Sequence, residues 1–167
     1  MDFREIKTDE LNENVFNMIG KKWMLVTAEN EGKVNSMTAS WGGLGIMWGK
    51  PVAFVFIRPQ RYTKTFIDNS DKMSLSFYNE EYRKMLNYMG TVSGRDEDKI
   101  EKSGLTTVFD NNVPYFEEAN MVIEVRKMYS QDMKEECVLE KEICEKWYSA
   151  KDYHTMYVCE IEKILMR

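Results

Sequence analysis

The feature that most constrains the fold is a pair of strand-like segments on either side of a short turn. Residues 23–28 and 34–39 are rich in residue types that favour β-strands, and residues 30–33 between them read Asn-Glu-Gly-Lys. Asn and Gly tolerate the positive φ that a tight hairpin turn demands. The sequence therefore predicts an antiparallel β-hairpin in this part of the chain.

Further strand-like segments follow, with only short helices between them. Residues 51–57 form a nearly continuous run of β-branched and aromatic residues, which predicts a strand buried on both faces. Other predicted strands cover residues 72–78, 120–129 and 157–165. The predicted helices cover residues 10–18, 63–69, 80–89, 96–102 and 138–147. Without a regular βαβ alternation, this order favours a mainly β, antiparallel, closed or nearly closed barrel with a few peripheral helices.

The glycine-rich segment 41–50 predicts a loop rather than a regular element. It contains Gly42, Gly43, Gly45 and Gly49. A dinucleotide-binding fingerprint fails here, because Trp48 stands where the third glycine belongs and no helical pattern follows. The sequence therefore does not predict a Rossmann fold.

Composition narrows the class of protein. The 167 residues are 43% hydrophobic and 13% aromatic, and they contain neither an internal repeat nor a linker-like tract. One domain over residues 1–167 is therefore expected. No apolar run approaches the roughly 20 residues that cross a bilayer, and the start lacks a secretory signal, so a cytoplasmic protein without membrane attachment is expected.

Charge and cysteine content exclude other classes. A net charge of -5 argues against a nucleic-acid partner, because phosphate backbones are bound mainly by basic patches. Cys137, Cys144 and Cys159 show no paired spacing, which argues against a disulfide framework or a zinc site. We expect no metal, and three reduced, mostly buried thiols.

Candidate binding residues gather where two predicted strands end. The first group is Met37, Thr38, Ala39, Ser40 and Trp41, and the second is Arg58, Gln60, Arg61, Tyr62 and Thr63. Small side chains and exposed backbone suit a planar ring, whereas hydroxyl and guanidinium groups suit a phosphate. Taken singly, the hydroxyls are also typical of solvent-facing strands and the arginines of ordinary protein surfaces.

A second polar group follows the predicted helix 80–89. Ser93, Arg95 and Lys99 stand in the sequence Ser-Gly-Arg-Asp-Glu-Asp-Lys, which is compatible with anion binding. The same residues are also compatible with a turn and helix cap between two helices, in which the acidic residues complement the helix dipole. The two interpretations are compatible with each other.

The order of these motifs resembles one known family. Residues 35–41, then 57–63, then Ser93-Gly-Arg-Asp with Lys99, and finally residues 152–157 resemble the flavin reductase-like proteins of the FMN-binding split-barrel fold, flavoredoxin type. The resemblance spans about residues 12–165. It implies a split, Greek-key-like barrel and a homodimer with FMN near the subunit interface.

The resemblance also assigns parts of the cofactor to parts of the chain. The flavin ring is expected along residues 37–41 and the phosphate at residues 58–63, with Ser93, Arg95 and Lys99 as further contacts. Two functions are open: flavin reduction by NADH or NADPH, and non-enzymatic electron transfer by an FMN carrier to a redox protein partner. A weaker third is a barrel that has lost flavin. The glycine-rich segment departs from the loop of many flavin reductases, which puts the nicotinamide partner in doubt.

His154 is the one histidine of the sequence. A hydrolase built on it with Ser93 or Cys159 is conceivable, but a hydrogen-bonded histidine beside a barrel strand is the simpler interpretation. The resemblance offers a third interpretation, in which His154 lies near the flavin. In one form of this interpretation, His154 reaches the flavin of the other subunit across the dimer interface. The catalytic residues are not predicted.

Overall fold

The predicted hairpin is present and its turn has the expected backbone. The computed structural model describes residues 2–167. Strands β2 (Met24–Asn30) and β3 (Lys33–Ala39) pair from Met24 opposite Ala39 to Asn30 opposite Lys33. Glu31 and Gly32 between them both have positive φ, 51° and 77°, as a tight two-residue hairpin turn requires.

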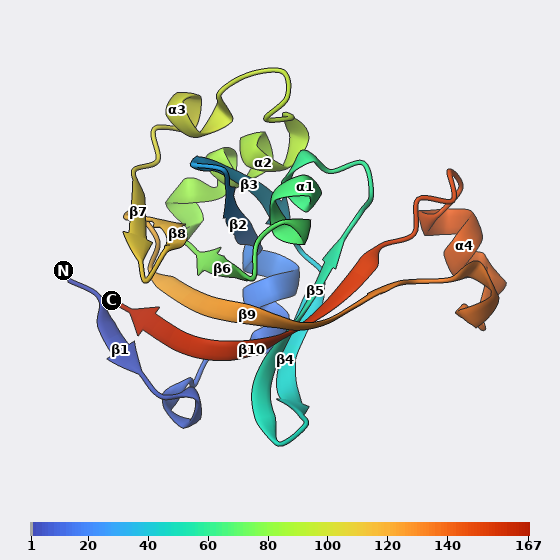
Figure 1. The fold of residues 1–167 in the computed structure, drawn as a ribbon, viewed down its shortest axis with the longest axis horizontal. Helices are drawn as coiled ribbons and strands as arrows, with labels where there is room; N and C mark the ends of the chain where they lie inside the picture. The colour runs from blue at the N-terminus through green and yellow to red at the C-terminus, as the bar shows by residue number, and fades with distance from the viewer. Residues whose placement is uncertain (1) are drawn as a thin grey trace.

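The main sheet is antiparallel and curls around one core (Figure 1). Its strands follow the order β3-β2-β6-β9-β10-β5-β4, and the short β1 (Arg4–Ile6) pairs with β10. The remaining strands of this path are β4 (Gly42–Met47), β5 (Lys50–Ile57), β6 (Lys72–Phe77), β9 (Met121–Asp132) and β10 (Thr155–Met166). The path begins at β3 and ends at β4. In the chain these two strands are joined by only two residues, Ser40 and Trp41. The result is the antiparallel split barrel that the sequence predicted.

Two apolar clusters hold the sheet from its two sides. Inside the barrel, buried side chains from most strands meet, among them Val26, Leu75 and Val55. On the outer face, Leu25 and Val122 pack against α2 (Arg83–Thr91) and a small hairpin. That hairpin, β7 (Thr107–Asp110) and β8 (Val113–Phe116), was not predicted from the sequence.

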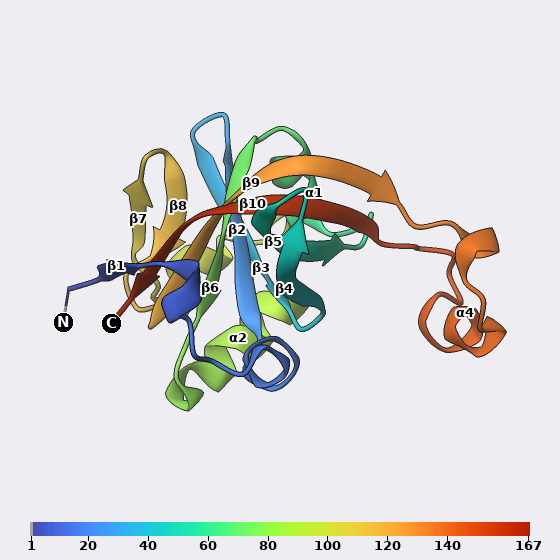
Figure 2. The same ribbon diagram turned by 90° about the horizontal axis from the view of Figure 1, so that it is seen from below.

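The helices are peripheral and unevenly placed. Helices α1 (Tyr62–Asp68), α2 and α3 (Lys99–Ser103) lie on one side of the barrel (Figure 1). Helix α4 (Lys141–Trp147) lies apart at the far end of β9 and β10 (Figure 2). We call residues 133–154, which connect these two strands, the arm. Nowhere in residues 2–167 is a helix both long and apolar enough to cross a bilayer.

The helix predicted over residues 10–18 is shifted toward the C-terminus, because the chain is helical from residue 15 to residue 22. A short 3-10 helix covers Thr8–Glu10, and a π-helix covers Asn17–Lys22. The side-chain Oδ1 of Asn14 accepts a hydrogen bond from the backbone N–H of Asn17 at 3.0 Å. An asparagine in this position caps a helical start, so the winding begins after it rather than before.

The glycine-rich segment is a strand rather than the predicted loop. Strand β4 pairs with β5 from Gly42 opposite Val55 to Met47 opposite Lys50. A Cβ on Gly42 would lie 2.7 Å from the carbonyl oxygen of Phe54, and Cβ atoms on Gly43 and Gly45 would touch the Phe54 ring. The close approach of the Phe54 backbone therefore requires glycine at position 42, whereas the contacts at Gly43 and Gly45 are of ordinary length.

Two other predictions need correction. Strand β5 is not buried on both faces, because Phe54 and Phe56 stay half-exposed while Val55 and Ile57 are buried. The cysteines are not mostly buried: Cys159 is buried in β10, but Cys144 is half-buried and Cys137 is exposed. Both of the less buried cysteines belong to the arm, whose helix α4 lies away from the barrel (Figure 2).

Candidate functional site

Two adjoining hollows run along β3. The narrow hollow, about 150 Å³, is lined by Met37, Thr38, Ala39, Ser40, Trp41, Phe56, Arg58, Arg61 and His154. The wide hollow, about 400 Å³, is lined by Asn35, Met37, Arg58, Gln60, Arg61, Tyr62, Thr63, Thr91, Val92, Ser93, Gly94 and Lys99. The two share three lining residues, Met37, Arg58 and Arg61, and so form one groove. Every predicted site residue except Arg95 lines it, and Arg95 stacks on Tyr62 at its edge.

The narrow hollow lies at the split of the barrel. Its floor is the end of β3 and the connection to β4, and Phe56 closes it from β5. The hydroxyl of Thr38 donates a hydrogen bond to the backbone carbonyl of Leu86 in α2. Thr38 thus fixes β3 to α2 and is not the solvent-facing strand residue that its type alone suggested.

His154 forms one wall of the narrow hollow and is held by aromatic neighbours. Its Nδ1 lies 2.8 Å from the hydroxyl of Tyr148, and its ring centroid is 5.1 Å from that of Trp41. Burial, together with the nearby Arg58 guanidinium, lowers the pKa of His154 to about 4. His154 is therefore neutral near pH 7 and can exchange hydrogen bonds without adding charge.

Arg58 and Gln60 both bind the arm. Arg58 donates to the carboxylate of Asp152 at 2.7 Å and to the backbone carbonyl of Trp147 at 2.9 Å. Gln60 donates to the same Asp152 oxygen, also at 2.7 Å. The guanidinium of Arg58 also lies over the Tyr148 ring, 5.1 Å from its centroid. These contacts hold the arm beside the narrow hollow, where Trp147 packs edge-on against Trp41.

Arg61 and Lys99 line the wide hollow where it meets the C-terminal end of α2. Arg61 donates to the backbone carbonyl of Gly90 at 2.7 Å, and Lys99 donates to those of Met89 and Val92 at 2.8 and 3.0 Å. These carbonyls belong to the C-terminal end of α2, where the helix dipole favours cations. Two positive charges are thereby fixed at one wall of the hollow.

Burial leaves both cations incompletely compensated. It lowers the pKa of Arg61, with a further contribution from Arg58, and it lowers the pKa of Lys99 to about 8, with a further contribution from Arg61. A lowered pKa means that the surroundings disfavour the charged form. An anion in the wide hollow would stabilise the charged forms of both side chains.

Several lining residues were missed from the sequence. Asn35 is buried, and its side-chain amide donates to the hydroxyl of Thr63 at 2.8 Å, which links β3 to the start of α1. Its signal was a polar residue at the start of an otherwise strand-like motif. Gly94 belonged to the predicted Ser-Gly-Arg motif but was not itself named as a site residue. Phe56, Thr91 and Val92 carried no comparable signal, because their positions depend on how β5 and α2 pack.

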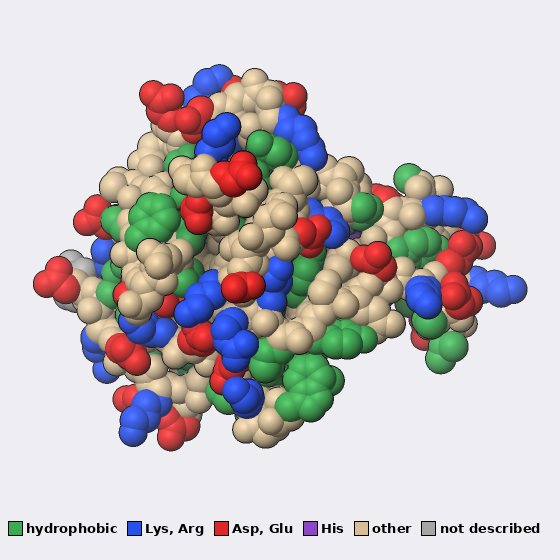
Figure 3. Space-filling view, viewed as in Figure 1, with side chains coloured by type: hydrophobic (Ala, Val, Ile, Leu, Met, Phe, Trp, Pro, Cys, Tyr) green, Lys and Arg blue, Asp and Glu red, His purple; other side chains and the backbone are tan. Residues whose placement is uncertain are grey.

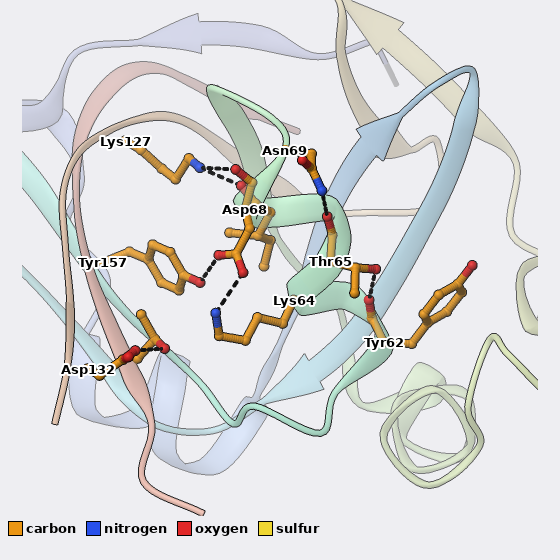
Figure 4. A network of polar contacts seen from close by, with 10 residues as sticks. Tyr62, Lys64, Thr65, Asp68, Asn69, Lys127, Asp132 and Tyr157 are labelled. Atoms are coloured by element: carbon orange, nitrogen blue, oxygen red, sulfur yellow. Dashed lines mark hydrogen bonds and ion pairs between the residues drawn. The ribbon is translucent and has the colours of Figure 1, made fainter. Parts of the chain in front are cut away.

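Helix α1 is anchored at its far end by a polar network (Figure 4). The carboxylate of Asp68 accepts hydrogen bonds from the Tyr157 hydroxyl at 2.5 Å and from Lys64 at 2.7 Å. Lys127 of β9 donates to the backbone carbonyl of Ile67. Although burial alone raises the pKa of Asp68, the hydrogen bonds from Lys64 and Tyr157 lower it overall. The network fixes α1, whose first residues line the wide hollow.

The groove thus joins a small, partly aromatic compartment to a cationic, hydroxyl-bearing one. Such a pair can hold a ligand in which a flat ring is connected to a phosphate. Among residues 2–167, no cluster of three or more His, Cys, Asp and Glu side chains is placed to hold a metal ion.

Comparison with known proteins gives one family and a consistent fold. The model of the family described as "Flavin reductase like domain" matches residues 17–167. A search of curated protein sequences gave no significant match.

Solved structures of similar fold include an FMN-binding protein from Thermus thermophilus with bound p-hydroxybenzaldehyde, at 19% identity and a TM-score of 0.70, covering 98% of this chain and 82% of that one. The FMN-binding domain of a flavin reductases-like enzyme from Shewanella baltica has 14% identity and a TM-score of 0.73, covering 99% and 78%. A flavoredoxin from Methanosarcina acetivorans has 22% identity and a TM-score of 0.70, covering 97% and 76%. At these identities the similarity establishes the fold.

Proposed function

We propose, because this chain belongs to the flavin reductase-like domain family, that it binds FMN along β3 and takes part in flavin-dependent electron transfer. The observation that carries the proposal is the continuity of the two hollows through Met37, Arg58 and Arg61. A small compartment for a ring and a cationic one for a phosphate stand side by side, in the order in which FMN carries these groups.

The residues present fit this cofactor. In the wide hollow, Arg61 and Lys99 supply positive charge, and Thr63 and Ser93 supply hydroxyl groups for the phosphate. In the narrow hollow, the backbone of residues 37–41 and the side chain of Phe56 present a surface for the ring. FMN, when bound, supplies the redox chemistry, and the protein supplies orientation and electrostatics.

The chain's own residues have separable tasks at this site. Arg61 and Lys99 bind the anionic end, and Thr38 keeps the β3 floor fixed against α2. Trp41 lines the narrow hollow, and Trp147 packs edge-on against it with ring centroids 5.0 Å apart. His154 is neutral and bonded to Tyr148, so it contributes hydrogen bonding rather than charge beside the ring.

The favoured activity is NADH- or NADPH-dependent flavin reduction, which we propose on the basis of the family. An electron carrier for a protein partner is the second candidate, and one observation favours it. The arm exposes Leu139, Ile143 and Trp147, with exposed fractions of 94%, 38% and 44%, and Trp147 packs against Trp41 of the narrow hollow. Exposed apolar side chains near a redox site suit transient contact with another protein.

A homodimer is also proposed, on a separate apolar surface. Ile46 and Trp48 of the β4–β5 hairpin are 73% and 56% exposed, and Tyr129 of β9 lies beside Trp48 with ring centroids 6.2 Å apart. Figure 3 shows hydrophobic side chains gathered over this hairpin at the lower edge of the molecule. Light scattering of the wild-type chain and of Trp48→Glu tests it: a dimer that the substitution dissociates supports this surface, and a monomeric wild type contradicts the homodimer.

One spectroscopic experiment tests the central proposal. The purified chain is mixed with FMN, desalted, and scanned for visible absorbance. We expect flavin bands that remain with the protein; a colourless protein would contradict FMN binding. Anaerobic addition of NADH or NADPH to the flavin-loaded protein then separates the two activities. Bleaching supports the reductase, whereas unchanged bands support the carrier.

A further inference from the structure

The groove along β3 ends at a wall beyond the wide hollow. On the other side of this wall lies an outer hollow of about 420 Å³. The wide and outer hollows have in common four lining residues, which are Asn35, Tyr62, Gly94 and Lys99. Lys99 is nearly inaccessible to solvent, with 4% of its surface exposed. We call these four residues the partition because, unlike the three residues shared by the narrow and wide hollows, they include a close contact of Gly94 with Asn35 and Tyr62.

Close packing at Gly94 leaves no passage through the partition there. A Cβ on Gly94 would overlap Oδ1 of Asn35 and lie 3.2 Å from Cδ1 of Tyr62. The backbone of residues 93–95, which we call the strap, therefore rests directly on these two side chains. The sequence Ser93-Gly-Arg95 requires glycine at its centre for this approach.

Arg95 fastens the strap to the start of α1. Its guanidinium lies over the Tyr62 ring, 4.6 Å from the centroid, and donates a hydrogen bond to the backbone carbonyl of Gln60 at 3.2 Å. Asn35 in turn donates to Thr63, so that both sides of the partition are tied to the same turn of chain.

The charge of the lining residues changes across the partition. On the inner side, Arg58 and Arg61 line the wide hollow, and the Lys99 ammonium is bonded to Met89 and Val92. On the outer side, Glu97, Asp98 and Lys33 line the outer hollow; Lys102 forms an ion pair with the Glu97 carboxylate, and the Asp98 carboxylate caps α3. A phosphate on the inner side meets cations, whereas the outer side combines one lysine with two carboxylates that already have partners and offers a second phosphate no comparable cationic site.

We propose that the strap makes this site selective for a flavin that ends in a phosphate monoester. In this proposal the phosphate lies against the partition, so a flavin that continues in the same direction, through a pyrophosphate to an adenylate, meets the strap before it reaches the outer hollow. This inference rests on the proposed function, because it concerns the phosphate end of the same FMN site. It assigns a specificity role to Gly94 and Arg95, which lie outside the ring-binding part of the groove.

The test measures dissociation constants of the full chain for FMN, FAD and riboflavin by flavin fluorescence. Displacing the strap costs the Arg95 contacts, so we expect FMN to bind roughly tenfold more tightly than FAD. Arg95→Ala removes the fastening from an exposed position. In that variant we expect the preference for FMN over FAD to fall to about threefold or less.

Arg83→Ala is a matched control. Arg83 also lies over an aromatic ring, that of Trp23 at 3.5 Å, and also donates to a backbone carbonyl, that of Lys22 at 3.1 Å. It lies outside the groove, so its removal should leave the FMN-to-FAD ratio unchanged. Tyr62→Ala is a second opening variant and should narrow the ratio as Arg95→Ala does.

The possible outcomes distinguish a failure of the strap's role from a failure of FMN binding itself. Equal binding of FMN and FAD by the wild-type chain overturns the strap's role while leaving flavin binding intact. An FMN preference that neither Arg95→Ala nor Tyr62→Ala reduces also overturns it, because the selectivity then originates elsewhere. A chain that binds none of the three flavins overturns the proposed function and the inference together. A ratio that narrows in both opening variants and not in Arg83→Ala supports it.

Discussion

Arg58 and Arg61 belong to the same short turn between β5 and α1, yet they hold different parts of the molecule. The guanidinium of Arg58 is bonded to the Asp152 carboxylate and to the Trp147 carbonyl, both in the arm. The guanidinium of Arg61 instead donates to the backbone carbonyl of Gly90, at the end of α2. A carboxylate neutralises the first arginine, whereas a single carbonyl leaves most of the second charge available.

The local backbone explains the divergence. The N–H of Arg61 donates to the carbonyl of Arg58 at 3.2 Å, which closes a turn around Pro59 and Gln60. From this turn the side chain of Arg58 reaches the arm, whereas that of Arg61 reaches the end of α2. The difference teaches that two arginines in one motif need not share a ligand: one shapes the site through the arm, and the other is free to bind an anion.

The largest predicted effect belongs to Arg61. Arg61→Ala removes a partly buried charge from the wide hollow, and a charge-assisted hydrogen bond contributes about 1.5–3 kcal/mol. We therefore expect the dissociation constant of FMN to rise by roughly ten- to a hundredfold. Fluorescence titration measures it, with Arg83→Ala as the control. Unchanged affinity would remove Arg61 from the phosphate site.

A smaller effect is expected for Arg58. Arg58→Ala removes the contacts that hold the arm and leaves Arg61 in place to bind the phosphate. FMN affinity should therefore fall by only about three- to tenfold. Tryptophan fluorescence should also change as Trp147 moves away from Trp41. Asp152→Asn removes the same ion pair and should reproduce both changes. If Arg58→Ala weakens FMN binding more than Arg61→Ala does, the comparison between the two arginines is wrong.

The pH dependence of FMN affinity tests the contribution of Lys99 to the wide hollow. The pKa of Lys99 is lowered to about 8, against 10.5 for a free lysine. As pH rises through about 8, Lys99 loses its charge, and FMN affinity should decline by a few-fold. The stability of the free protein should change in the opposite sense, because between these pKa values the unfolded chain binds more protons.

Lys99→Met provides the control for this profile. The variant should bind FMN more weakly at neutral pH and show a flatter dependence above about pH 8. A wild-type affinity that stays constant from about pH 7 to 9 would contradict a contribution of the Lys99 charge.

The smallest effect on binding is expected at the far end of α1. Tyr157→Phe removes the hydrogen bond to Asp68, which should lower the free energy of unfolding by about 1 kcal/mol. That corresponds to roughly 2–4 °C in the melting temperature of a chain of this size. FMN affinity should change by less than about twofold, since the Lys64 bond still holds Asp68. A large loss of affinity would instead show that α1 positions the phosphate site.

Local sequence patterns predicted most of the barrel, because alternation and turn residues act within one or two strands. The hairpin around Glu31 and Gly32 is an example. The glycine-rich β4 was mispredicted because the reason for Gly42 is the close approach of Phe54, a residue of another strand. The hairpin of β7 and β8 was missed because both strands are short and owe their place to packing on the outer apolar cluster.

The candidate site shows the same division. Its lining residues could be predicted from the order of motifs, since the ends of neighbouring strands meet in space. Which partner each side chain chooses could not be predicted. Asp152 reaches Arg58 because β10 pairs with β5, with Thr155 opposite Ile57, and Gly94 touches Asn35 because the chain after α2 passes over β3. Such choices depend on the tertiary arrangement rather than on spacing.

The way in which the arm joins the sheet has a consequence for how proteins of this design can diversify. Asp132 and Thr155 face each other as the last strand pair before the arm, and their side chains are hydrogen-bonded. Because this pair closes the base, the arm can gain or lose residues without shifting the register of β9 and β10. Doubling such a loop costs only about 0.6 kcal/mol of closure entropy. Insertions here would remodel the entrance beside Trp41 and His154 while the barrel stays the same, so new partners can be acquired at little cost to stability.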